Sequence, residues 1–207
     1  MTVTLVDYGM GNRRSVEKAL EHVGARVART SDPELIATAD AIVLPGVGAF
    51  PEAMRRLAAL GLADPIREHA LAGVPLLGIC LGMQLLFERS DEHEGATGLG
   101  LLPGRVERLR APVLKIPHIG WNSVSFTRRA TLTEGLGEAA TFYHVHSFAC
   151  RPDDEDDVVG LGEYGEPFVS IVERGNVMGA QFHPEKSSRA GLALLGNFVA
   201  ACATVRA

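Results

Sequence analysis

The sequence has few of the features that mark secreted and membrane proteins. Only three cysteines occur among its 207 residues, at positions 80, 150 and 202. An odd number without close spacing argues against a disulfide framework and favours a reducing compartment. No apolar run approaches the roughly 20 residues that span a bilayer, and the first residues, MTVTLVDYGMGN, do not resemble a signal peptide. We therefore expect a cytoplasmic protein that does not contact membranes.

The sequence also lacks an excess of positive charge. It has 20 Lys and Arg against 25 Asp and Glu, which gives a formal net charge of −5. The arginine pairs at 13–14, 55–56 and 128–129 are too far apart in the chain to predict a basic stripe. Nucleic acid is therefore not an expected partner.

One dense run of charged residues is present, RPDDEDD at 151–157. No His or Cys is placed beside it to complete a ligand set, so we interpret this run as a solvated loop. The sequence accordingly predicts neither a metal nor a cofactor.

The first hundred residues alternate between strand-like and helix-like segments. Strands are expected at 2–6, 25–28, 41–46 and 74–79. Helices are expected after the cap Asn12, from Asp32-Pro33, from Pro51, from Asp64-Pro65 and over 81–88. This alternation is typical of a flavodoxin-like α/β fold, in which helices cover both faces of a mostly parallel sheet.

The second half of the chain has a different pattern of expected secondary structure. Segments such as GRVERLR, WNSVSF, ATFYHVHSF and EPFVSIVERGNVMGAQFH are strand-like, and Gly175-Asn176 is a candidate hairpin turn. A helix is expected only at 188–203. With a length that suits one well-buried core, we predict a single domain over 1–207, its parallel core extended by antiparallel strands.

Cys80 lies where a predicted strand meets a predicted helix, in the pattern Gly78-Ile79-Cys80-Leu81-Gly82. This G-x-C-x-G arrangement is the cysteine form of the nucleophile elbow. The small residues leave room for close backbone, and the following helix directs N–H groups and its positive end toward the sulfur. The N–H of Leu81 can also stabilise an oxyanion. Cys150 and Cys202 fit the alternative interpretation, a small buried hydrophobe.

A nucleophile of this kind needs a base, and QFHPEKS at 181–187 offers one. Pro184 favours an extended conformation at His183, and residues two apart in an extended segment face the same way. His183 and Glu185 are therefore expected to project together, with the carboxylate orienting the imidazole. Taken alone, His-Pro-Glu fits an ordinary turn equally well. Together with Cys80 it predicts a triad.

At these residues the sequence resembles the triad-type glutamine amidotransferases. GICLGMQ and FHPE look like the nucleophile and His/Glu motifs of that superfamily. The segments DYGMGN, LPGVGAF, PHIGWN, YHVHSF and HPEKS together resemble the glutaminase subunit of imidazole glycerol phosphate synthase. Arg13, His144 and Phe148 depart from the residues that this family often has, and all three leave the triad intact.

The resemblance implies a reaction and a set of site residues. Glutamine is hydrolysed to glutamate and ammonia through a thioester on Cys80, with His183 as base and Glu185 as its orienting group. The residues expected to form the oxyanion site and bind glutamine are Gly46, Val47, Gly48, Leu81, Gln84, Tyr143, Ser147 and Phe148. Two of these have plain alternatives, since Gln84 also fits a surface-facing helix position and Tyr143 an ordinary strand position.

The resemblance also implies a partner, a (β/α)₈-barrel cyclase that receives the ammonia in histidine biosynthesis. Asn12, Trp121 and Lys186 are the candidates for the docking face of this heterodimer. A partly buried core position is the alternative for Trp121, and an exposed lysine without a role is the alternative for Lys186. Val47 stands where many relatives have Gly, and we hypothesise that this stiffer peptide aims its donor only after docking.

Three other functions remain possible at this point. A glutaminase can serve another ammonia acceptor or act alone as a γ-glutamyl hydrolase. A cysteine hydrolase or chaperone-like protein on a related fold would not depend on the imidazole of His183. A non-catalytic regulatory subunit has no need for the intact set of Cys80, His183 and Glu185, which argues against it.

Overall fold

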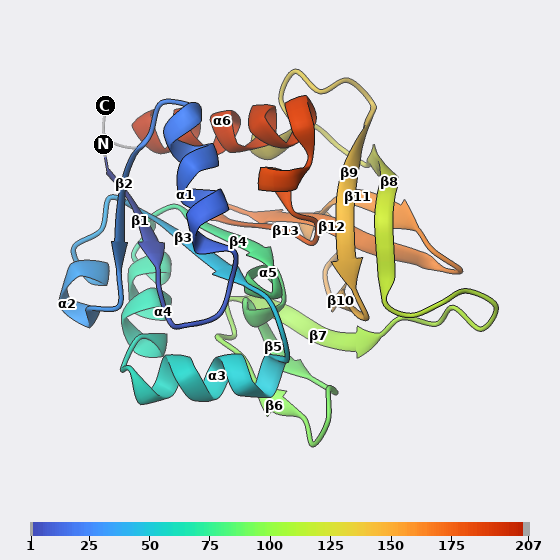
Figure 1. The fold of residues 1–207 in the computed structure, drawn as a ribbon, viewed down its shortest axis with the longest axis horizontal. Helices are drawn as coiled ribbons and strands as arrows, with labels where there is room; N and C mark the ends of the chain where they lie inside the picture. Colours follow the sequence, from blue (N-terminus) through green and yellow to red (C-terminus); the bar gives the residue numbers. More distant parts are fainter. Residues whose placement is uncertain (1, 205–207) are drawn as a thin grey trace.

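The computed structural model describes residues 2–204, and the centre of the fold is a parallel sheet (Figure 1). Its strands run in the order β2 (Arg26–Thr30), β1 (Thr2–Val6), β3 (Ala41–Gly46), β4 (Leu76–Cys80) and β13 (Val177–Ala180). Every residue of β3, β4 and β13 is buried. Two helical layers exclude water from these strands, which explains their nearly continuous apolar sequence.

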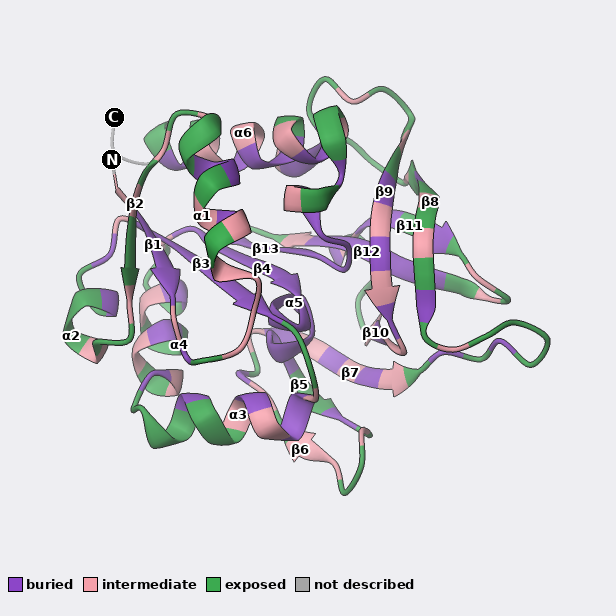
Figure 2. Cartoon of the chain, viewed as in Figure 1, coloured by how far each residue is buried: buried purple, intermediate pink, exposed green. Residues whose placement is uncertain are grey.

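Helices cover both faces of this sheet, as predicted (Figure 1). One face carries α1 (Arg13–His22) and α6 (Ser188–Thr204), and the other carries α3 (Phe50–Ala59) and α4 (Ala63–Leu71). The short helices are α2 (Pro33–Ile36), capped by the Asp32 side chain as expected, and α5 (Leu81–Leu85). Figure 2 shows the consequence: the central strands and α5 are buried, and the helices on the two faces of the sheet carry both buried and exposed residues.

Antiparallel strands extend the sheet beyond β13. In spatial order they are β12 (Pro167–Arg174), β10 (Phe148–Pro152), β7 (Leu102–Arg108), β5 (Phe87–Ser90) and β6 (Ala96–Thr97). The β12–β13 pair is the predicted hairpin, with Arg174 opposite Val177 across the Gly175-Asn176 turn. A second branch consists of β11 (Val158–Glu163), β8 (His118–Phe126) and β9 (Ala139–His146). Three single-turn 3₁₀ helices complete the fold, at Thr131–Thr133, Glu155–Asp157 and Pro184–Lys186.

The helix predicted over 81–88 is wrong beyond Leu85. The chain leaves the helix there and enters β5, which pairs with β7 and β6. The segment that follows accounts for this early end. The carbonyl oxygens of Leu85, Leu86 and Phe87 accept hydrogen bonds from backbone N–H groups of residues 99–102. They are therefore occupied before a further helical turn can use them.

The interpretation of 151–157 as a solvated loop is also wrong in part. Its start belongs to β10 and its end to the 3₁₀ turn at 155–157. The Asp157 side chain is buried and pairs with Nε of Arg174 at 2.6 Å, while Asp154 pairs with Nη2 of the same arginine at 2.7 Å. Within residues 2–204, no group of three or more His, Cys, Asp or Glu residues is arranged to hold a metal ion. Nor does any helix in that range combine the length and apolarity needed to cross a membrane.

Candidate active site

The topology brings three separate segments to one edge of the sheet. β4 ends at Cys80, and its two neighbours are β3 and β13. Gly46, the last residue of β3, lies opposite Cys80, and Ala180 lies opposite Ile79. The loop after β3 and the QFHPE segment after β13 therefore flank the sulfur. The carboxyl edge of an open α/β sheet is the usual place for such a site.

Cys80 occupies a strained turn between β4 and α5. Its φ of 56° and ψ of −112° lie outside the regions that L-residues normally adopt. The flanking glycines are required sterically: a Cβ on Gly82 would lie 1.8 Å from the Leu44 carbonyl oxygen, and one on Gly78 2.6 Å from the Gly82 oxygen. The backbone thus holds the sulfur at the start of α5. The first backbone N–H groups of a helix have no hydrogen-bond partner within that helix.

The imidazole of His183 is held by a buried carboxylate. Its Nδ1 lies 3.0 Å from Oε1 of Glu185, and both side chains are almost completely buried. Nδ2 of Asn12 donates to the same oxygen at 3.3 Å. The other carboxylate oxygen, Oε2, has no hydrogen-bond partner among residues 2–204. The predicted extended geometry holds at His183 only. The pair meets because Pro184–Lys186 form a 3₁₀ turn, which brings Glu185 back under the ring.

The electrostatics favour a charged imidazole beside the sulfur. Burial works to lower the pKa of His183, but hydrogen bonds to Cys80 and Glu185, with their charges, outweigh it and raise that pKa to about 10. The other two thiols have no such partner. Burial raises the pKa of Cys150 well above its usual value and that of Cys202 to about 12, so both stay as inert thiols.

A pocket of about 210 Å³ opens at Cys80 and His183. Of the residues predicted to form it, six line it: Val47, Gly48, Leu81, Gln84, Ser147 and Phe148. Four further lining residues were not predicted: Glu92, Pro117, Val145 and His146.

Gly46 and Tyr143 do not line the pocket. Gly46 lies beneath it, where a Cβ would meet the Tyr8 hydroxyl at 2.6 Å and the Leu81 Cβ at 2.9 Å. The Tyr143 ring packs edge-on against Trp121, with centroids 5.9 Å apart, while its carbonyl oxygen accepts from the His183 N–H at 3.0 Å. Tyr143 therefore supports the histidine through its backbone, and its ring lies against Trp121 outside the pocket lining.

Gln181 is a polar residue at the site that the sequence analysis missed. It is fully buried, accepts from Nε2 of Gln84 at 3.0 Å, and places its own Nε2 4.0 Å from Sγ of Cys80. The second hydrogen of the Gln84 amide goes to the Phe148 carbonyl oxygen at 3.1 Å. Gln181 precedes His183 by two residues, so the alternation expected of an extended segment, which selected Glu185, also pointed to Gln181.

The DYGMGN segment supports the carboxyl end of β3. The Tyr8 hydroxyl is buried and donates to the Pro45 carbonyl oxygen at 2.8 Å. Burial raises the pKa of Tyr8, so the hydroxyl keeps its proton and remains a donor. Arg13, one of the departures from the family pattern, forms an ion pair with Asp7. This pair joins the two ends of the loop that carries Tyr8.

The candidate docking residues lie at different depths. Trp121 is 56% exposed, which makes the core interpretation wrong, and its neighbour on the same strand, Ile119, is 60% exposed. Lys186 is exposed and directly follows Glu185. Asn12 is half-buried and contacts Glu185.

Comparisons with known proteins give a consistent family assignment. The family described as "Glutamine amidotransferase class-I" matches residues 4–202. A protein of Moorella thermoacetica named "Imidazole glycerol phosphate synthase subunit HisH" is 52% identical over 196 residues, which cover 95% of this chain and 93% of that protein. The Aquifex aeolicus protein of the same name is 52% identical over 199 residues, with 96% of each chain covered.

Solved structures show the same fold at low identity. The structure of PurLQS from Thermotoga maritima superposes with a TM-score of 0.75 at 21% identity and covers 100% of this chain and 99% of that one. The glutaminase domain of Trypanosoma brucei CTPS gives 0.69 at 15% identity, covering 99% and 94%. The mixed sheet, with its parallel core and antiparallel C-terminal half, is thus the fold of this family.

Proposed function

Because the chain belongs to the class-I glutamine amidotransferases, and within them to the HisH subunits of imidazole glycerol phosphate synthase, we propose that Cys80, His183 and Glu185 hydrolyse glutamine for a synthase partner. The observation that carries this proposal is the convergence of the three residues at the end of β4. Sulfur and imidazole line one pocket, and a buried carboxylate holds the ring.

The reaction follows from the protonation states at the site. The sulfur of Cys80 attacks the carboxamide carbon of glutamine, and His183 beside it holds the proton of the thiol. The N–H of Leu81, at the start of α5, and an N–H from residues 46–48 stabilise the oxyanion; each such donor is typically worth about 10²–10³ in rate. His183 then protonates the departing nitrogen, and ammonia leaves. A water that His183 activates cleaves the thioester to glutamate and regenerates the thiolate.

The ammonia has to leave as a neutral molecule, because the protonated form is no nucleophile. We infer that it passes to a (β/α)₈-barrel cyclase docked as a heterodimer over Trp121 and Lys186. There it completes the conversion of a phosphoribulosyl-formimino carboxamide ribonucleotide into imidazole glycerol phosphate and an aminoimidazole carboxamide ribonucleotide. Exposed apolar side chains at Ile119 and Trp121 support this placement. Asn12 is better assigned to the triad, since it donates to Glu185.

A glutamine-like electrophile tests the nucleophile directly. We expect a chloroketone analogue of glutamine to add one adduct per chain, at Cys80, when the chain is in complex with the cyclase. Peptide mass spectrometry locates the adduct, and Cys150 and Cys202 serve as internal standards because both are buried and protonated. An adduct at either standard with Cys80 untouched would refute the assignment, and excess glutamine has to protect Cys80.

The amide of Gln181 provides a second test of the site. We expect Gln181→Met to slow alkylation of Cys80 by iodoacetamide about tenfold at neutral pH, because a donor to the thiolate is lost; hydrogen bonds to charged groups contribute roughly 1.5–3 kcal/mol. The matched control is Gln181→Glu at a pH low enough to protonate the new carboxyl, which keeps both a donor and an acceptor. Equal alkylation rates for wild type and Gln181→Met would show that Gln181 only fills space.

A further inference from the structure

Two buried histidines beside the pocket have no part in the mechanism above. His118 is the first residue of β8 and His146 the last residue of β9, and the two lie opposite each other in the antiparallel pair. Their exposed fractions are 3% and 5%. A buried imidazole needs partners for both ring nitrogens, because an unpaired polar atom costs free energy. The partners of these two rings determine which nitrogen donates and which accepts in each hydrogen bond.

The hydrogen bonds run inward from the surface. Nδ2 of Asn122 donates to the Glu163 carbonyl oxygen at 2.9 Å and lies 3.3 Å from Nε2 of His118. An amide nitrogen only donates, so this ring nitrogen is the acceptor and Nδ1 of His118 carries the proton. Nδ1 then donates to Nε2 of His146 at 3.0 Å. Nδ1 of His146 in turn donates to the Phe148 carbonyl oxygen at 2.9 Å.

This direction requires both rings to be neutral. Burial lowers the pKa of His146 to about 4 and also lowers that of His118. The ring packed against His118 from β9 is His144, whose pKa burial lowers to about 2, and Tyr164 stacks on the other side at 4.0 Å. None of the ion pairs within residues 2–204 joins a carboxylate to either ring. The tautomers are therefore set by the hydrogen bonds and stay set at neutral pH.

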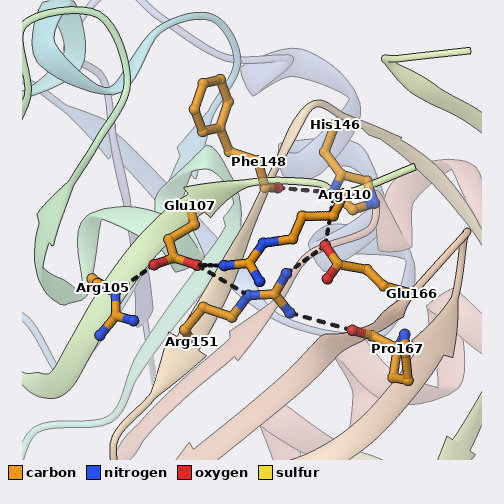
Figure 3. Close-up of polar contacts among 8 residues, drawn as sticks. All are labelled: Arg105, Glu107, Arg110, His146, Phe148, Arg151, Glu166 and Pro167. Atoms are coloured by element: carbon orange, nitrogen blue, oxygen red, sulfur yellow. Dashed lines mark hydrogen bonds and ion pairs between the residues drawn. The ribbon is translucent and has the colours of Figure 1, made fainter. Parts of the chain in front are cut away.

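The chain of hydrogen bonds ends on a group that shapes the pocket. The Phe148 carbonyl oxygen accepts both from His146 and from Nε2 of Gln84. Figure 3 shows the His146 ring directed at this carbonyl. With its two amide hydrogens committed to Phe148 and Gln181, Gln84 has only its side-chain oxygen left to serve a ligand. If the Phe148 carbonyl moved, the side-chain amide of Gln84 would no longer be held in this orientation.

Neighbouring ion pairs hold the strand that carries Phe148. Glu107 on β7 pairs with Arg105 at 2.6 Å and lies 3.7 Å from Nε of Arg151 on β10. Arg151 also pairs with Glu166 at 2.5 Å, and Figure 3 shows these groups beside the His146–Phe148 contact. β10 is thus held from one side by charged groups and at its first residue by His146.

We propose that His118 and His146 are positioning residues for glutamine, forming a two-imidazole relay that fixes the Phe148 carbonyl and, through it, the amide of Gln84. The inference rests on the proposed function, because it assigns the relay to the glutamine site. The relay contacts no reacting atom, so its loss weakens substrate binding more than turnover.

The test compares variants of His146 in the complex with the cyclase. We expect His146→Leu to raise KM for glutamine about tenfold while kcat changes less than threefold. His146→Asn keeps a donor near the position of Nδ1 and is expected to bring KM back to within about threefold of wild type. Failure of the Asn variant to improve on Leu, with both folded, would overturn the relay.

His144→Phe is the matched control. His144 is equally buried and packs against both relay rings, but its hydrogen bonds go to Phe142 and Ser170, away from the pocket. The KM of His144→Phe for glutamine is expected to stay within about twofold of the wild-type value. A rise equal to that of His146→Leu would mean that any disturbance of this ring cluster loosens the site, and the proposal would fall.

Calorimetry separates this inference from the proposed function. In complexes that carry Cys80→Ala, glutamine binding is measured without turnover, and His146→Leu is expected to weaken Kd about tenfold. Absence of any glutamine binding by the Cys80→Ala complex would reject the proposed function itself. Binding that His146→Leu leaves unchanged would reject the relay alone.

Discussion

Replacing Cys80 by alanine will abolish glutamine-dependent synthesis by the complex and leave ammonia-dependent synthesis largely intact. The thioester cannot form without the sulfur, and loss of the nucleophile costs about 10⁶ in kcat in a triad where the effect is known. The cyclase keeps its own site and accepts ammonia from solution. Alanine carries the same Cβ as cysteine, so the variant keeps the strained turn and is expected to fold as the wild type does.

The measurement is glutamate release and imidazole product formation by the complex, with glutamine or an ammonium salt as nitrogen source. Cys150→Ala is the control, because Cys150 is buried outside the pocket and should lose neither activity. Hydrolysis above about 1% of the wild-type rate would exclude Cys80 as the nucleophile. Loss of both activities in a folded complex would give the sulfur a different role.

Glu185→Gln is expected to lower kcat for glutamine hydrolysis about 10⁴-fold, as the matching acid-to-amide change does in a Ser-His-Asp triad. The substituted amide can turn its nitrogen toward Nδ1 of His183, which then favours the wrong tautomer. The negative charge that stabilises the imidazolium is lost with it, and Asn12 loses a charged acceptor.

The pH dependence of this variant has a definite sign. Glu185 is one of the two groups that raise the pKa of His183 to about 10, and the charged ring is present below that value. Without the carboxylate the pKa falls, so the imidazolium is lost at lower pH and the basic limb of the rate profile moves toward neutrality. Profiles between about pH 6 and 10 measure this shift.

Glu173→Gln is the matched control for the carboxylate substitution. Glu173 accepts from the backbone and side chain of Thr131 and from the backbone N–H of Leu132, far from the pocket lining. Its replacement should leave kcat and the basic limb unchanged. An unmoved basic limb in Glu185→Gln would mean that His183 is not the group whose charge limits the rate.

Predictions from sequence succeeded where the cause is local. The nucleophile turn follows from glycines at 78 and 82, because backbone from the same turn and from β3 occupies the space of a side chain there. The Asp32 cap and the Gly175-Asn176 hairpin are decided by a few neighbouring residues in the same way. The motifs that identified the family are read from the chain directly, and the family is confirmed.

They failed where a distant segment intervenes. The helix from Leu81 is cut short because residues 99–102 occupy its last carbonyl groups. Asp157 is buried because Arg174, on another strand, reaches it. Tyr143 faces Trp121 instead of the pocket because its strand pairs in a register that puts the two rings on the same face. None of these contacts leaves a pattern in the local sequence.

The amino-acid sequence by itself determined the family, the sharp strand–helix turn at Cys80 and the histidine–glutamate pair, because short-range sterics and residue chemistry specify them. Tertiary structure alone decided which groups surround the sulfur. β3 and β13 flank β4 only after the sheet assembles, and that assembly brings residues 45–48 to one side of Cys80 and Gln181 and His183 to the other. The hydrogen bonds from Gln84 to Gln181 and from His146 to Phe148 likewise depend on strand pairing, which long-range packing sets.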